Sequence, residues 1–400
     1  MSTLTADEAR SYAVRSHFLE APSSTITTVA EQLVGLHNTS QVSPYLSVNA
    51  RFQRFTRRQL DELMWERWEL ARFRAMRLTM FVLPRPLIEV VAAATQHIVE
   101  PLGAKWLRDS GMTPRQFERH ASAVMEALEE GPLTSRELRR LLGVPQEVDL
   151  PSVVSRLCEQ GRVVGGAPPG SWRSGVRRFH LWEQVLSDVD IHRWTEAAAI
   201  TELVWRYLRG YGPVTLSDIS WWTGFTKARC RRALDTLRDS IMEVEVDGWP
   251  GPLYHHRCAG DTSMGEPSVG VLPMLDPYVQ GYRDRQRLIT EELRDFVWDG
   301  GGNATATIVR RGEIIGVWQP LIKPAAVRYH LFAGARADRA EVEARLQEVG
   351  QIYFDEAVDI REVEEMRSLR DPGKARSAAH PLDDQLHRSN RSIDADRTSD

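Results

Sequence analysis

The chain has 400 residues, of which 42% are hydrophobic and 26% are charged, with a formal net charge of -4 at pH 7. These proportions are typical of a soluble globular protein with several domains, or with an array of small ones. No apolar run approaches the length of a membrane-spanning helix, so the composition excludes a helical membrane protein.

The N-terminal residues, MSTLTADEAR, are polar and acidic, which is not the pattern of a signal or transit peptide. Cys158, Cys230 and Cys258 lie far apart, without paired spacing. This arrangement favours reduced thiols and argues against a disulfide framework or a zinc site. We therefore expect a cytoplasmic protein with no metal and no other cofactor.

Positive charge is concentrated in two stretches although the whole chain is acidic. Residues 51–80 carry eight arginines and four acidic residues, and residues 221–240 carry five basic and two acidic residues. Local basic clusters of this kind indicate a surface for nucleic acid.

In chain order, the first notable stretch is the segment 33–46, LVGLHNTSQVSPYL, which we call the elbow. Thr28 and Glu31 have the capping-box pattern of a helix before it, and Ser43 with Pro44 has the N-cap and proline pattern of a helix after it. Five consecutive hydrogen-bonding side chains lie between: His37, Asn38, Thr39, Ser40 and Gln41. The run is either a functional site or a polar loop whose side chains bond the local backbone.

The chain also contains an internal repeat. Residues 131–143 and 212–224 both begin with Gly-Pro, continue with a threonine and an acid three residues later, and end at a glycine. Each copy follows a predicted long helix (114–130, 195–210) and precedes a second helix (151–160, 226–238) and a β-rich pair. Helix, turn, helix, helix and wing is the order of a winged helix. Residues 24–86, with a predicted hairpin over 70–83, have a similar order.

The predicted fold class is therefore α+β. We expect tandem winged-helix units over residues 1–110, 111–190 and 191–260, which together form a concave DNA-binding array. A C-terminal β-rich unit with a terminal helix is predicted over 261–365, with Arg311, Gly312 and Glu313 as a hairpin turn. Residues 366–400 have the composition of a disordered tail.

Winged helices contact nucleic acid through the third helix or the wing. In the third unit that helix carries Lys227, Arg229 and Arg232, and the wing tip carries Trp249. The alternatives are a solvated helix face and an aromatic lid on a hairpin turn. In the first unit the expected DNA contacts are Arg51, Arg72, Arg74 and Arg77.

Three stretches resemble the AlkZ/YcaQ-like family of winged-helix DNA glycosylases. Residues 36–52 are similar to the family's LQAQxxxxPYLSLWARL pattern, residues 75–79 to AMRGT, and residues 272–285 with 312–318 to LLPxxDxxxxGYRDR and GxxxGxW. The resemblance implies a monofunctional glycosylase that hydrolyses the bond between deoxyribose and a bulky N7-alkylated purine. It also implies a role in repair of, or self-resistance to, a genotoxic natural product.

In this family two glutamines of a Q-x-Q motif hold the attacking water. The resemblance places His37 and Thr39 at those positions, with Asn38 between them, so these three residues are the expected catalytic group. A neutral imidazole and a hydroxyl can both position water. The alternatives are a site altered for another lesion and an inactive site. Leu78 replaces the family's glycine, and Phe81 stands where a histidine is frequent.

A second class of function is a non-catalytic winged-helix DNA-binding protein, either a regulator or a lesion shield. Such a regulator usually dimerises, whereas the sequence shows no sustained heptad. The expected partner is double-stranded DNA carrying an alkylated purine. We expect the protein to bind it as a monomer and not to associate with a membrane. Asp276, Asp284 and Arg285 are either catalytic or, as we favour, a buried network that ties the C-terminal unit to the array.

Overall fold

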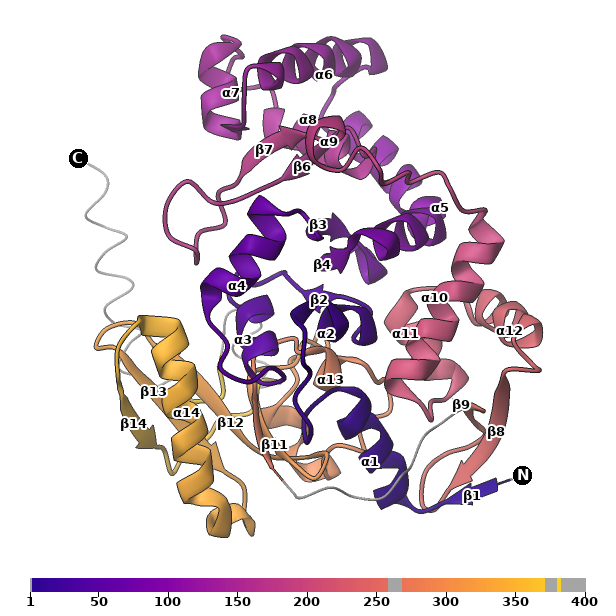
Figure 1. Cartoon of the computed structure of the whole chain (residues 1–400), viewed down its shortest axis with the longest axis vertical. Helices are drawn as coiled ribbons and strands as arrows, with labels where there is room; N and C mark the ends of the chain where they lie inside the picture. The colour runs from indigo at the N-terminus through magenta and orange to yellow at the C-terminus, as the bar shows by residue number, and fades with distance from the viewer. Residues whose placement is uncertain (1, 258–267, 371–379, 383–400) are drawn as a thin grey trace.

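The computed structural model describes residues 2–257, 268–370 and 380–382, and its fold is α+β. Figure 1 shows the first predicted unit in the centre, the second at the top, the third at the right and the C-terminal unit at the lower left. In the described part of the chain no helix combines the length and the apolar character needed to cross a membrane.

The first unit places the elbow at the edge of a small sheet. Its elements are α2 (Ile26–Gln32), β2 (Leu36–His37), α3 (Ser43–Asn49), α4 (Arg57–Asp61), a π-helical turn (Glu62–Glu66), β3 (Leu70–Arg74) and β4 (Met80–Pro84). The antiparallel order β2-β4-β3 aligns His37, Phe81 and Phe73 in one row across the sheet.

The predicted hairpin over 70–83 is confirmed as β3 and β4, but both caps predicted beside the elbow are wrong. Thr25, not Thr28, caps α2, and Ser43 is the first residue of α3 rather than its cap.

The two repeats adopt the same order of elements. The second unit contains α6 (Pro114–Glu129), β5 (Leu133–Thr134), α7 (Ser135–Leu141), α8 (Leu150–Glu159), β6 (Val163–Gly165), β7 (Arg178–Leu181) and α9 (Trp182–Val185). The third contains α10 (Glu196–Tyr211), α11 (Leu216–Thr223), α12 (Lys227–Thr236), β8 (Ile241–Val246) and β9 (Leu253–His256). Thr134 and Thr215 form capping boxes with Glu137 and Asp218, as the repeat pattern predicts.

The first residues of the chain lie against the third unit, although they are predicted to belong to the first. β1 (Ser2–Leu4) pairs in parallel with β8. α1 (Ala6–Ser16) contacts α10, where the Tyr12 hydroxyl donates to the carbonyl of Arg209 at 2.7 Å. The N-terminus therefore extends the third unit's sheet.

The C-terminal unit is a five-stranded sheet in the order β10-β11-β12-β13-β14, with α14 (Arg339–Phe354) packed on it. The strands are β10 (Val269–Leu272), β11 (Thr307–Arg310), β12 (Glu313–Leu321), β13 (Ala326–Leu331) and β14 (Asp359–Glu362). Arg311 and Gly312, with φ of 50° and 79°, form the predicted hairpin turn. Most of the tail predicted at 366–400 lies outside the described residues.

The units share buried apolar surface. α5 (Arg85–Asp109) and α10 pack along one another and belong to the largest core cluster, which includes residues from every unit. Tyr207, Tyr211 and Trp222 stack within it, and the Tyr207 hydroxyl donates to the carbonyl of Gly281 at 2.7 Å. The position of each unit relative to the elbow is thus set by packing.

Candidate active site

The elbow is a sharp turn that leads into a short edge strand. Val34 and Gly35 have φ of 55° and 101°. A Cβ on Gly35 would lie 2.4 Å from the Cδ2 of Leu83 and 3.1 Å from the Cδ1 of Phe81. The path into β2 therefore requires a glycine at position 35.

His37 is buried and neutral. Its side chain is 7% exposed, and its ring meets Phe81 edge-on with centroids 5.0 Å apart. Burial, and then the positive charge of Arg77, lower the pKa of His37 to about 4. The Thr39 N–H approaches Nδ1 at 3.4 Å, so Nδ1 acts as the acceptor and the single proton belongs on Nε2.

Asn38 and Thr39 have opposite environments. Asn38 is 2% exposed. Its N–H donates to the carbonyl of Met80 at 2.7 Å, and its Oδ1 accepts a hydrogen bond from the Nε of Arg72 at 2.5 Å. Thr39 is exposed, and its hydroxyl has no hydrogen bond within the described chain. The elbow thus combines two fixed side chains with one that is accessible.

Arg72 holds the elbow in place through a hydrogen bond to Asn38. Burial, followed by the nearby charge of Arg177, lowers the pKa of Arg72 to about 10. Because its Nε bonds Asn38, we infer that Arg72 positions the elbow; a DNA contact by the rest of its guanidinium stays a prediction.

Arg51, expected at the DNA surface, is completely buried. Its guanidinium donates to both oxygens of Asp276, at 2.6 and 2.9 Å, and its Nε donates to the carbonyl of His17 at 3.0 Å. The prediction that Arg51 contacts DNA is therefore wrong, since no DNA can reach it. The predicted buried network is confirmed for Asp276.

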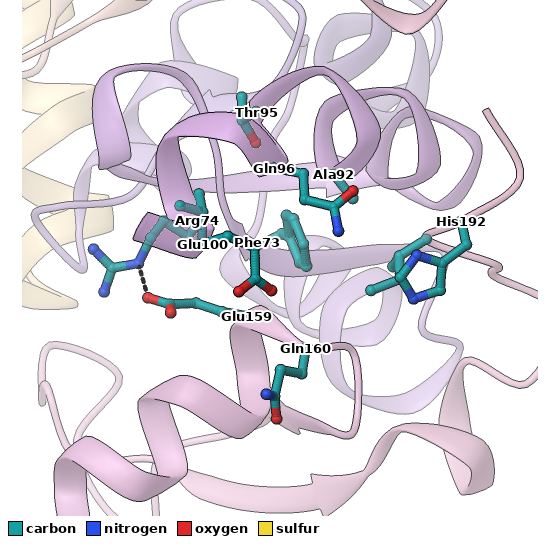
Figure 2. Close-up of a pocket in the computed structure, with 11 residues that line it drawn as sticks. Phe73, Arg74, Ala92, Thr95, Gln96, Glu100, Glu159, Gln160 and His192 are labelled. Carbon is teal, nitrogen blue, oxygen red and sulfur yellow. Dashed lines mark ion pairs between the residues drawn. The ribbon is translucent and has the colours of Figure 1, made fainter. Parts of the chain in front are cut away.

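Arg74 lines a cavity separate from the elbow (Figure 2). The cavity, about 240 Å³, lies between β3, α5, α8 and the segment at residues 191–192, and none of the residues that line it belongs to the elbow. There the Nε of Arg74 lies 2.9 Å from the Oε1 of Glu159, an ion pair drawn in the figure. The carboxylate of Glu159 therefore already compensates the charge of Arg74. The predicted contact between Arg74 and a DNA phosphate stays a prediction.

Arg77 lies in a 3-10 turn (Met76–Leu78) between β3 and β4, and it reaches the third unit. Its Cζ is 3.9 Å from the ring centroid of Trp221 on α11. Arg77 and Leu78 both have left-handed φ, of 54° and 61°. Position 78 is where the resemblance expects glycine, which adopts this conformation without strain. Leucine there keeps the turn but at a conformational cost.

The predicted basic helix forms as α12, with Lys227 and Arg232 exposed on it. Arg229, however, is ion-paired with Glu196. Trp249 is half-buried in the β8–β9 turn, and the Cζ of Arg287 lies 4.4 Å from its ring centroid. This arrangement matches the alternative of an aromatic lid on the hairpin turn. The indole of Trp249 lies against Arg287 and does not project as a wedge.

The second unit's wing lies against the elbow's second helix, a contact that the sequence pattern does not predict. Residues 166–177 connect β6 to β7; Trp172 within them meets Tyr45 of α3 edge-on at 4.9 Å and lies 4.8 Å from the Cζ of Arg57. Arg177 donates to the side chain of Gln41. The available signal was a tryptophan and arginine inside a glycine- and proline-rich loop.

Comparisons with known proteins agree with this architecture. A family model described as DNA glycosylase AlkZ-like matches residues 30–352. An interstrand DNA cross-link repair glycosylase of Streptomyces sahachiroi is 27% identical over 237 residues, a match that spans 54% of this chain and 62% of that protein. The solved structure of Streptomyces sahachiroi DNA glycosylase AlkZ is similar in fold, with a TM-score of 0.73 and 21% identity over 91% of this chain and 100% of that chain.

Proposed function

Because the chain belongs to the AlkZ-like DNA glycosylase family, we propose that it hydrolyses the N-glycosidic bond of alkylated purines in double-stranded DNA. The preferred lesions are bulky N7-alkylguanines, including the interstrand cross-links named for the Streptomyces sahachiroi relative. The biological role is repair of, or self-resistance to, a DNA-alkylating natural product. The observation that carries the proposal is the elbow, where a buried neutral His37 ends the edge strand β2 and an exposed Thr39 lies two residues further on, in the bend that follows.

The same proposal includes the architecture. The three units, with boundaries near residues 110, 190 and 260, are tandem winged helices whose concave side receives DNA, and the protein acts as a monomer. The recurring order of helices and hairpin supports this assignment. Lys227 and Arg232, exposed on α12, are then phosphate contacts of the third unit.

The reaction needs no strong acid from the protein. N7 alkylation makes the purine cationic, so the electron pair of the breaking C1′–N9 bond neutralises the leaving base. Water adds to the resulting oxocarbenium-like C1′ and loses a proton to solvent. The protein must hold that water in line and stabilise the developing charge.

His37 and Thr39 fit the role of holding water. With a pKa of about 4, His37 is a weak base at neutral pH, so we assign it to positioning and not to proton abstraction. Its Nε2–H can donate to the water oxygen, while the Thr39 hydroxyl accepts one of the water protons. Together these contacts would direct a lone pair of the water at C1′.

The test is base release from a duplex carrying one N7-alkylguanine, either methylated or bulky. His37→Ala should lower the single-turnover rate by about 10²-fold or more, as loss of a positioned group does, with DNA binding retained. His37→Gln, which restores the family's residue, should keep most of the rate. Ser40→Ala, in the same loop, is the matched control.

The second candidate function is a lesion shield or regulator without catalysis. One observation favours it: burial and the charge of Arg77 lower the pKa of His37 to about 4, so the residue at the first motif position is a weak base at neutral pH. Tight binding of the lesion duplex by the wild type, with no release of the base, would establish this alternative and refute the glycosylase proposal.

A further inference from the structure

Arginines without carboxylate partners gather around Trp221. Arg77 comes from the β3–β4 turn and Arg285 from the loop after α13 (Pro277–Gln280), a loop that also carries the exposed Arg283. Among the described residues none of these three arginines forms an ion pair. The Cζ atoms of Arg77 and Arg285 lie 3.9 and 6.0 Å from the Trp221 ring centroid.

The capping residue of α11 holds this loop in place. One oxygen of Asp218 accepts hydrogen bonds from Thr215 in the capping box. The other accepts the N–H groups of Arg283 and Asp284, at 2.8 and 3.0 Å. Asp218 is completely buried, so the loop is docked on the helix that carries Trp221. The arginines are therefore brought together by the fold before any ligand arrives.

The guanidinium of Arg285 is held by an aromatic ring and a carbonyl, and it has no carboxylate partner among the described residues. Its guanidinium lies over Trp298, 4.5 Å from the ring centroid, and its Nη2 donates to the carbonyl of Gly302 at 3.2 Å. Neither contact supplies negative charge. Burial first, and then the charges of Arg370 and Arg294 followed by those of Arg77 and Arg283, lower the pKa of Arg285 to about 10. Collecting half-buried like charges costs free energy, which a bound anion would recover.

We propose that Arg77 and Arg285, assembled against Trp221, bind one phosphodiester of the DNA backbone beside the elbow. Planar guanidinium groups pair with phosphate oxygens through two hydrogen bonds each, and two such groups at one aromatic ring suit a single phosphate. The site lies beside the elbow because the turn that carries Arg77 leads into β4, where Phe81 pairs with His37 and Met80 accepts the N–H of Asn38. It combines the first unit, the third unit and the C-terminal segment, so it exists only when they are docked. The inference rests on the proposed function in taking DNA as the ligand.

Binding to an unmodified duplex tests the site without requiring catalysis. Fluorescence anisotropy at several salt concentrations gives the dissociation constant and the slope of log K against log salt, which changes by about 0.9 for each phosphate contact. Arg77→Gln and Arg285→Gln should each weaken binding. The double variant should lose about one contact in slope, not two, because both arginines share one phosphate. Arg345→Gln, on the outer helix α14 where Arg345 pairs with Glu348, should change neither quantity.

A methylphosphonate scan locates the phosphate on the wild-type protein. One neutral linkage should weaken wild-type binding and have no effect on the double variant. The inference is overturned if no linkage behaves in this way, or if the variants lose thermal stability while the salt slope is unchanged, since the arginines would then only join the units. Base release is measured separately, so loss of the phosphate site and loss of the glycosylase proposal are distinguishable.

Discussion

Arg51 and Asp276, 225 residues apart in the sequence, form a doubly hydrogen-bonded ion pair in which both side chains are completely buried. Arg51 lies two residues after the end of α3, the helix after the elbow. Asp276 caps α13, where it accepts the N–H of Tyr278 at 3.0 Å. The pair therefore fixes the elbow's second helix to the C-terminal unit.

Removing one partner of this pair should be strongly destabilising. Asp276→Ala leaves the Arg51 charge buried without compensation, which typically costs about 3–5 kcal/mol in the free energy of unfolding. Urea titration followed by circular dichroism measures it. Glu348→Ala, which breaks the exposed pair with Arg345, should cost no more than about 1 kcal/mol. Equal effects of the two substitutions would show that the buried pair does not hold the units together.

The contact between Arg72 and Asn38 should be visible as thermodynamic coupling. Arg72→Leu leaves the buried Asn38 Oδ1 without its donor, at a cost of about 1–3 kcal/mol. The cost should shrink when Asn38→Leu is already present, because no orphaned acceptor then remains. A double-mutant cycle of unfolding free energies gives the coupling, and strict additivity would argue against the contact.

Base excision should be nearly independent of pH around neutrality. Since burial and Arg77 lower the pKa of His37 to about 4, its ring stays neutral from about pH 6 to 8. Single-turnover rates across this range should be level. An inflection near pH 6.5 that disappears in His37→Gln would mean that the ring titrates as an exposed histidine.

The fold should lose stability as the medium becomes mildly acidic. Burial lowers the pKa of His255 and of His37 to about 4, and it holds the pKa of His17 well below its usual value. Below about pH 6.5 the unfolded chain binds protons on these rings while the folded chain does not, so the unfolding free energy falls between about pH 6.5 and 4. Melting temperatures at pH 7.5 and 5.0 measure this loss.

His255→Leu is the variant that isolates one ring, because neither nitrogen of His255 has a hydrogen-bond partner in the described structure. It should reduce the difference between the two melting temperatures, whatever its effect at pH 7.5. An unchanged difference would exclude His255 as a source of the acid sensitivity.

The wing at 166–177 should be released by Trp172→Ala. The substitution removes the contacts with Tyr45 and Arg57, so the loop is expected to open more often. Limited trypsin digestion should then cut faster after Arg173, with little change in melting temperature. Trp106→Ala, at an exposed tryptophan of α5, is the control. Equal cleavage of both variants would indicate that Trp172 does not hold the wing.

The sequence by itself determined the repeated units, most helices and the C-terminal hairpin turn. These features depend on interactions between residues a few positions apart, such as the Thr134–Glu137 and Thr215–Asp218 capping boxes and the left-handed Arg311–Gly312 turn. Interactions between residues that are close along the chain can be predicted from the sequence alone. The elbow could be located in the sequence because residues 36–52, a short continuous stretch, are similar to the family's pattern.

Only the tertiary structure decided what each arginine does. Arg51 faces a buried carboxylate, Arg72 supports Asn38, Arg74 is paired with Glu159, and Arg77 meets Trp221. The partners lie 34 to 225 residues away or in another unit, and a guanidinium can serve phosphate, carboxylate, amide or aromatic ring equally well. Its role is therefore set by what packing brings within reach, which the order of residues along the chain does not reveal.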